Sequence, residues 1–196
     1  AVDDAERAIE TASLLQADCL TVYTGARAGH TKSHAKRLIQ MALEQLLPVA
    51  EVNDVVLAVE PMHPRAGVDW TFLTDLESTL ELVERIGSRY LQIALDTYHW
   101  GRSRKLYSMM RDLVPNLAVV FLGDAKSSPD EEQNRCLLGD GNISLERMLS
   151  AFLEHGYDGC FDIRLTGEDL ETLSYPEILR HSCQAYEALV AGAKVD

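Results

Sequence analysis

The sequence has few basic residues and no long apolar run. It contains 18 Lys and Arg against 31 Asp and Glu, which gives a formal net charge of −13. Because such a surface repels phosphate groups, we expect the protein to bind neither nucleic acid nor anionic membranes. No uninterrupted apolar stretch approaches the ~20 residues that a membrane-spanning helix needs.

Paired cysteines, signal-peptide features and nucleotide-binding motifs are also missing. Four scattered cysteines without a Cys-x-x-Cys pair are typical of reduced thiols, so we expect a cytoplasmic protein. The acidic start lacks the basic and apolar stretches of a signal peptide, and without an initiator Met we expect an upstream segment that is removed or not shown. No glycine-rich dinucleotide motif and no Gly-x-Ser-x-Gly elbow occur, and we expect no nucleotide cofactor.

The chain does contain a regular alternation of apolar runs and amphipathic stretches. Five short apolar runs have the character of strands buried on both faces, at 19–23, 55–59, 91–95, 117–122 and 160–165. Six amphipathic stretches are predicted as helices, at 5–16, 34–51, 75–86, 103–113, 144–155 and 176–190. Strands that alternate with helices favour a parallel sheet with right-handed crossovers.

We therefore predict one α/β domain over residues 1–196, a parallel (β/α) TIM-barrel type with about five strands and six helices. A complete eight-stranded barrel needs about 250 residues, so this would be the C-terminal portion of a barrel that lacks its first three βα units. An open doubly wound parallel sheet is the alternative. A partial barrel exposes strand edges, and we expect a homo-oligomer if the chain is truly truncated.

Acidic residues follow three successive predicted strands. Glu60 comes directly after 55–59, Asp96 directly after 91–95, and Asp124 two residues after 117–122, with His63 and His99 close behind the first two. Carboxylates at the edge of an apolar core are costly unless they are paired or bind a metal. In parallel α/β sheets this edge is where active sites are built, so the acids predict a functional site.

These motifs carry a family resemblance. The segments Val59-Glu60-Pro-Met-His63 and Leu95-Asp96-Thr-Tyr-His99-Trp100-Gly resemble the xylose isomerase-like superfamily of sugar-phosphate isomerases and epimerases, which shares its barrel with endonuclease IV. The resemblance implies metal binding by Glu60 and Asp96 and a substrate-side position for His99. It also implies that the segment with Gly123, Asp124, Arg135 and Gly139-Asp-Gly141 is the loop in which an Arg contacts substrate.

Two positions depart from the family pattern. The resemblance implies a metal-binding His and a metal-binding Glu on the last two strands, where this chain has Phe121 and Arg164. Arg164 could neutralise Glu60 and Asp96 by bidentate hydrogen bonds in place of the metal. In another alignment of the last strand, Asp162 takes the ligand position.

The resulting prediction is a sugar or keto-acid isomerase or epimerase that acts on a small polyhydroxylated carbonyl compound by metal-assisted proton transfer. The predicted catalytic residues are Glu60 and His99, and the metal, Mn, Mg, Zn or Co, would be bound incompletely by Glu60 and Asp96. The predicted substrate contacts are His63, Trp100, Asp124 and Arg135. The alternative, favoured by Phe121 and Arg164, is a catalytically degenerate, metal-free relative that binds a sugar-like ligand or a protein partner.

Overall fold

The five predicted strands are present and follow one another in space in their order along the chain. The computed structural model describes residues 1–67 and 69–193. Its strands form one sheet of order β1-β2-β3-β4-β5. A doubly wound sheet reverses its strand order at a switch point, and this order has no reversal, so the partial (β/α) barrel is confirmed over the open alternative. The strands are β1 (Cys19–Val22), β2 (Val56–Val59), β3 (Leu91–Asp96), β4 (Leu117–Leu122) and β5 (Cys160–Ile163).

All six predicted helices are present, but the predicted number was too low. Within the described residues there are eight α-helices and one 3-10 turn, η1 (Val114–Asn116). The two that were missed, α4 (Thr97–Trp100) and α7 (Glu168–Glu171), have four residues each, too few to give an amphipathic period. The others are α1 (Val2–Leu14), α2 (Lys32–Asn53), α3 (Leu76–Ile86), α5 (Arg104–Leu113), α6 (Leu145–Glu154) and α8 (Tyr175–Gly192).

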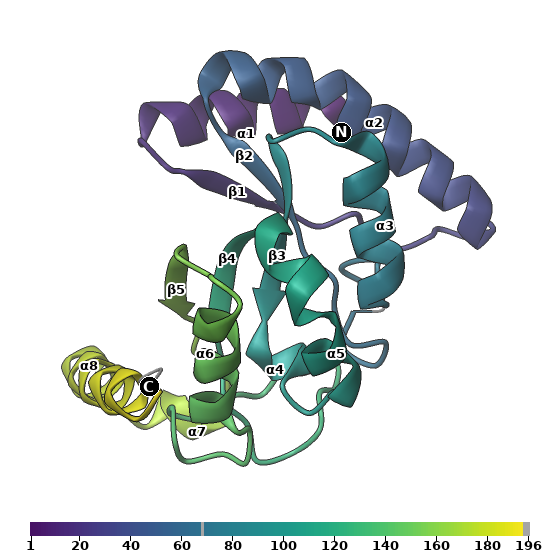
Figure 1. Cartoon of the computed structure of the whole chain (residues 1–196). Coiled ribbons are helices and arrows are strands. Elements are labelled where there is room, and N and C mark those ends of the chain that lie inside the picture. The colour runs from purple at the N-terminus through teal and green to yellow at the C-terminus, as the bar shows by residue number, and fades with distance from the viewer. Residues whose placement is uncertain (68, 194–196) are drawn as a thin grey trace. The chain divides into compact units, whose positions relative to one another are not determined.

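The first compact unit contains residues 1–94 and 116–119. Strand β2 pairs in parallel with β1 and with β3, in a register that sets Val59 beside Val22 and beside Ile93. Helix α1 packs on α2 and β1, and α2 packs on β2 and α3 (Figure 1). Strand β2 is buried on both faces, as its uninterrupted apolar sequence predicted.

The second compact unit contains residues 95–115 and the chain from 120 onward. Helix α6 contacts both α5 and α8, and buried Leu106, Met110, Met148 and Phe152 supply apolar side chains from α5 and α6. The division into two compact units does not test the predicted single domain, which stays a prediction.

No helix among the described residues combines the length and the apolar character needed to cross a membrane. The four cysteines are free thiols.

Each unit ends the sheet with a poorly covered strand. No residue of β1 is fully buried, and β5 alternates between exposed and half-buried residues. Beside β5, helix α8 leaves Tyr175 89% and Leu179 67% exposed, and both side chains line a cavity that they share with Ile163 and Leu170. An edge strand next to exposed apolar side chains is a template for pairing with another chain.

We expect the 196-residue chain to associate with further copies of itself when it is purified alone. Light scattering coupled to size-exclusion chromatography should give a mass of at least twice 21.8 kDa. The variant Leu179→Lys should shift the distribution toward the monomer, because it places a charge on the exposed apolar surface of α8. The exposed Glu187→Lys on the same helix is the matched control, and a monomeric wild type would contradict the expectation.

Candidate functional site

The ends of β2 and β3 place the predicted catalytic acids. Glu60 directly follows Val59, whose partner in the sheet is Ile93, and Asp96 closes β3 three residues beyond Ile93. Asp96 is also the N-cap of α4, and its Oδ1 accepts the backbone N–H of Tyr98 at 2.8 Å. Aspartate is a preferred N-cap residue because its carboxylate satisfies an otherwise unpaired helical N–H, and the turn that follows carries His99.

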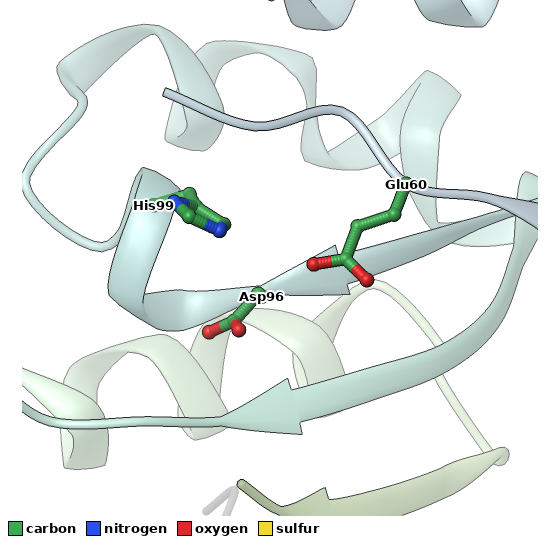
Figure 2. A group of neighbouring side chains, drawn as sticks. All are labelled: Glu60, Asp96 and His99. Atoms are coloured by element: carbon green, nitrogen blue, oxygen red, sulfur yellow. The ribbon is translucent and has the colours of Figure 1, made fainter. Parts of the chain in front are cut away.

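Glu60, Asp96 and His99 form a cluster of buried polar side chains. One potential ligand atom from each lies within 4.8 Å of the others (Figure 2). Their exposed fractions are 0%, 0% and 3%. Carboxylate oxygens and imidazole nitrogens are ligands for divalent ions, so this group could hold a metal. The structure therefore brings together both predicted catalytic residues and both predicted metal ligands.

Two guanidinium groups share one oxygen of Asp96. Arg135 Nη2 donates to Asp96 Oδ2 at 2.7 Å, and Arg164 Nη1 lies 3.3 Å from the same oxygen. Arg135 is itself buried, with Nη1 bonded to the carbonyl oxygen of Gln133 and to Thr166 Oγ1, each at 3.0 Å. The sequence predicted that Arg164 would neutralise both Glu60 and Asp96 by bidentate hydrogen bonds. The ion pair with Asp96 supports one part of that prediction, and the bidentate contact and the pairing with Glu60 stay predictions. Arg135 adds a shorter ion pair that the sequence did not reveal.

Both guanidinium groups lie on aromatic rings. The guanidinium carbon of Arg135 is 4.2 Å from the centre of the Tyr98 ring, and that of Arg164 is 3.4 Å from the centre of the Phe121 ring. The negative face of an aromatic ring attracts a cation, and a planar guanidinium can stack on it. Burial of Tyr98 raises the pKa of its phenol above the usual value of 10.0, so this ring stays neutral beneath Arg135.

The donor set fits a resident divalent ion poorly. Glu60, Asp96 and His99 offer three ligand atoms, but Asp96 Oδ2 already accepts hydrogen bonds from two cations. Phe121 and Arg164, at the positions where the resemblance implied two further ligands, carry no group that coordinates a metal. Asp162, the ligand in the alternative alignment, is exposed and lies outside the cluster found among the described residues.

Asp124 lies at the centre of the loop between β4 and α6. Its Oδ1 accepts the N–H groups of Ala125 and Ile143 at 2.8 and 3.2 Å, and its Oδ2 accepts those of Gly139 and Gly141 at 3.0 and 3.1 Å. A Cβ at Gly141 would collide with the Asp124 carboxylate, which explains the glycine. These bonds indicate a role in shaping the loop, and the predicted substrate contact stays a prediction.

His63 and Trp100 lie next to the cluster in sequence and are not among its three ligands. His63 is half-buried in the loop after β2, where its Nδ1 accepts the N–H of Arg65 at 3.3 Å. Burial and the charge of Arg65 lower the pKa of His63 below 6.5. Trp100 is the buried last residue of α4. Their predicted substrate contacts stay predictions.

A family model matches almost the whole chain. Residues 1–189 match the model described as the xylose isomerase-like TIM barrel. The chain belongs to this family. The resemblance seen in the motifs around Glu60 and Asp96 is thereby confirmed.

Similar xylose isomerase-like proteins are isomerases and epimerases by name. An inosose isomerase of Halalkalibacterium halodurans is 26% identical over 154 residues, which are 76% of this chain and 53% of that protein. A D-psicose 3-epimerase of Enterocloster bolteae is 29% identical over 118 residues, 60% of this chain and 36% of that protein. The chain thus spans about half or less of these curated relatives' length.

Solved structures support the same fold. A protein of Sinorhizobium meliloti 1021 superposes with a TM-score of 0.87 at 25% identity, over 96% of this chain and 70% of that one. The IolI protein, solved with a binding zinc atom, gives a TM-score of 0.82 at 18% identity, over 100% of this chain and 70% of that one. At such low identity the second likeness shows the fold alone.

Removing the Asp124 carboxylate should destabilise the second unit. The variant Asp124→Ala leaves four backbone N–H groups without their acceptor, so we expect the free energy of unfolding to fall by about 2–4 kcal/mol. Chemical denaturation followed by circular dichroism measures the change. The exposed Asp158→Ala is the control, and its effect should stay within about 0.5 kcal/mol. Equal stability of Asp124→Ala and wild type would contradict the assigned role.

His63 should titrate below its ordinary pKa of 6.5 when followed by NMR. Because the folded state then binds fewer protons than the unfolded state, its contribution to stability is complete above pH 6.5 and is lost as the pH falls toward the folded pKa. Arg65→Gln should raise the pKa only part of the way, since burial is the larger cause. Arg7→Gln, on exposed α1, should leave it unchanged, and a pKa above 6.5 would contradict the prediction.

Proposed function

We propose that this chain carries the catalytic residues of a sugar isomerase or epimerase, which acts on a small polyhydroxylated carbonyl compound by proton transfer. The observation that carries the proposal is the buried group of Glu60, Asp96 and His99, with ligand atoms within 4.8 Å of one another, in a xylose isomerase-like chain. Relatives named inosose isomerase and D-psicose 3-epimerase support the substrate class, because inososes and psicose are polyhydroxylated ketones.

The proposed reaction uses the carbon next to the carbonyl group. The Glu60 carboxylate takes the proton from that carbon, and the electron pair of the broken C–H bond moves into an enediolate. In an isomerisation Glu60 returns the proton to the neighbouring carbon, while the hydroxyl proton passes to the former carbonyl oxygen. In an epimerisation a proton from solvent reaches the opposite face of the same carbon, and Glu60 releases its own proton to solvent. His99 hydrogen-bonds the substrate oxygens, while guanidinium N–H groups beside Asp96 stabilise the negative oxygen of the enediolate. Substrate contacts by His63, Trp100, Asp124 and Arg135 belong to the same proposal.

Whether a divalent metal assists this proton transfer is a separate question. It is supported by the three ligand atoms of the cluster and by the IolI protein with its zinc atom. It is opposed by the two guanidinium groups that already bind Asp96. No step above depends on a metal.

A non-catalytic relative that binds a sugar-like ligand is the second candidate. Phe121 and Arg164 favour it, because they replace two groups that the family resemblance assigned to the metal. Cytoplasmic location and the absence of a nucleotide cofactor stay predictions from the sequence.

Solvent exchange tests the proposal. The protein is incubated in D2O with a panel of ketoses and inososes, and NMR follows deuterium uptake at the carbon next to the carbonyl. Wild type should exchange at least one compound, and Glu60→Gln should slow that exchange by about 100-fold or more, since a general base contributes 10²–10⁴. The matched control Glu81→Gln removes an exposed carboxylate on α3 and should leave the rate unchanged.

The negative outcomes are distinct. Saturable binding of a panel compound without exchange would favour the non-catalytic relative. Neither binding nor exchange by folded wild type would overturn the proposed function.

A further inference from the structure

Phe121 and Arg164 form one structural unit. The guanidinium carbon of Arg164 lies 3.4 Å from the centre of the Phe121 ring. Nη1 of the same guanidinium lies 3.3 Å from Asp96 Oδ2. The ring supports the cation on one side while the carboxylate binds it at the edge. The two departures from the family pattern are therefore in contact with each other, and one of them, Arg164, contacts the acid at the end of β3.

Arg135 holds the same carboxylate more tightly. Its ion pair with Asp96 is 2.7 Å long, its side chain is 2% exposed, and its other end is tied to Gln133 and Thr166. The Tyr98 ring lies 4.2 Å from its guanidinium carbon. Arg135 is thus held by fixed contacts around its planar group, and its ion pair fixes the Asp96 carboxylate in place.

The charges around Asp96 leave little role for a metal ion there. A buried carboxylate must be compensated, and two guanidinium groups on Oδ2 provide that compensation. A divalent ion bound to the same oxygen would lie next to two fixed positive charges. Like charges at such short range in a buried site repel strongly.

We propose that Arg164, stacked on Phe121, replaces the divalent ion of this site, so that the enzyme works without a resident metal. The proposal rests on the proposed function and deepens it. When a carboxylate base removes the proton next to the carbonyl, the electron pair moves to the carbonyl oxygen, and an Arg164 N–H donates to that oxyanion. The side chain of Arg164 is 22% exposed, which leaves it within reach of a substrate. Arg164 donates a hydrogen bond and transfers no proton, and carbon regains a proton without any redox change.

Metal binding tests this directly, independently of turnover. Wild type is dialysed against Mn²⁺ or Zn²⁺, then analysed for metal content and by calorimetric titration. We expect no stoichiometric ion. Phe121→His with Arg164→Glu supplies two donors beside Asp96 and removes one cation, so affinity for Mn²⁺ should rise by about 100-fold or more, given that outer-sphere changes alone alter it 10–100-fold.

The control for the double variant is Arg147→Gln. Arg147 also lies over an aromatic ring, 4.5 Å from the centre of Tyr107, but it does not contact Asp96. Its metal content should match that of wild type. One equivalent of ion on wild type that is lost in Asp96→Asn would overturn the proposal, as would an unchanged affinity in a folded double variant.

Measurements of solvent exchange distinguish the proposed replacement of the metal by Arg164 from the proposed isomerase function. Solvent exchange by wild type should survive chelation by EDTA, and Arg164→Met should slow it about tenfold or more while Arg164→Lys restores part of the loss, because the effect is one of charge. Exchange that EDTA abolishes and Mn²⁺ restores would overturn the replacement of the metal and leave the isomerase standing. Absence of exchange would overturn the isomerase, and the metal content would still decide whether Arg164 excludes an ion.

Discussion

The candidate site depends on the burial of one carboxylate, that of Asp96. A charged group with an exposed fraction of 0% is tolerated only if hydrogen bonds and opposite charges replace water. The α4 N-terminus satisfies one oxygen, and Arg135 and Arg164 satisfy the other. Because Arg135 lies in the β4–α6 loop and Arg164 directly follows β5, this single group joins three segments of the second unit.

A second carboxylate, that of Asp124, holds the β4–α6 loop and has a different role from that of Asp96. Asp124 accepts four backbone N–H groups, including those of Gly139 and Gly141, and thereby shapes the loop that carries Arg135. The backbone N–H of Arg135 donates to the carbonyl oxygen of Thr166 at 2.7 Å. One acid therefore holds the loop, and the other binds the side chain that the loop presents. The two strand-end acids look alike in sequence and differ in what surrounds them.

Sequence patterns predicted the strands well because apolar runs buried on both faces are hard to mistake, as in β2 and β3. The acids at Glu60 and Asp96 were predictable for the same reason, since they end those runs. Helix α4 was not, although an Asp three residues before His99 is an N-cap signal that could have indicated it. The contact of Arg135 with Asp96 could not be predicted, because an Arg 39 residues away has no periodic relation to the acid and suits solvent equally well. Arg164, 68 residues away, was predicted only because the family pattern implies a metal ligand at its position.

The two departures from the family pattern, Phe121 and Arg164, have different structural effects when each is considered alone and when both are considered together. Phe121 alone would remove a ligand and leave a buried acid short of positive charge. Arg164 alone would place a guanidinium beside Asp96 without a surface to lie on. In contact at 3.4 Å, the ring and the cation satisfy each other and the carboxylate at once. Since each makes the other tolerable, their contact supports the proposal that one positive charge has replaced another at this site.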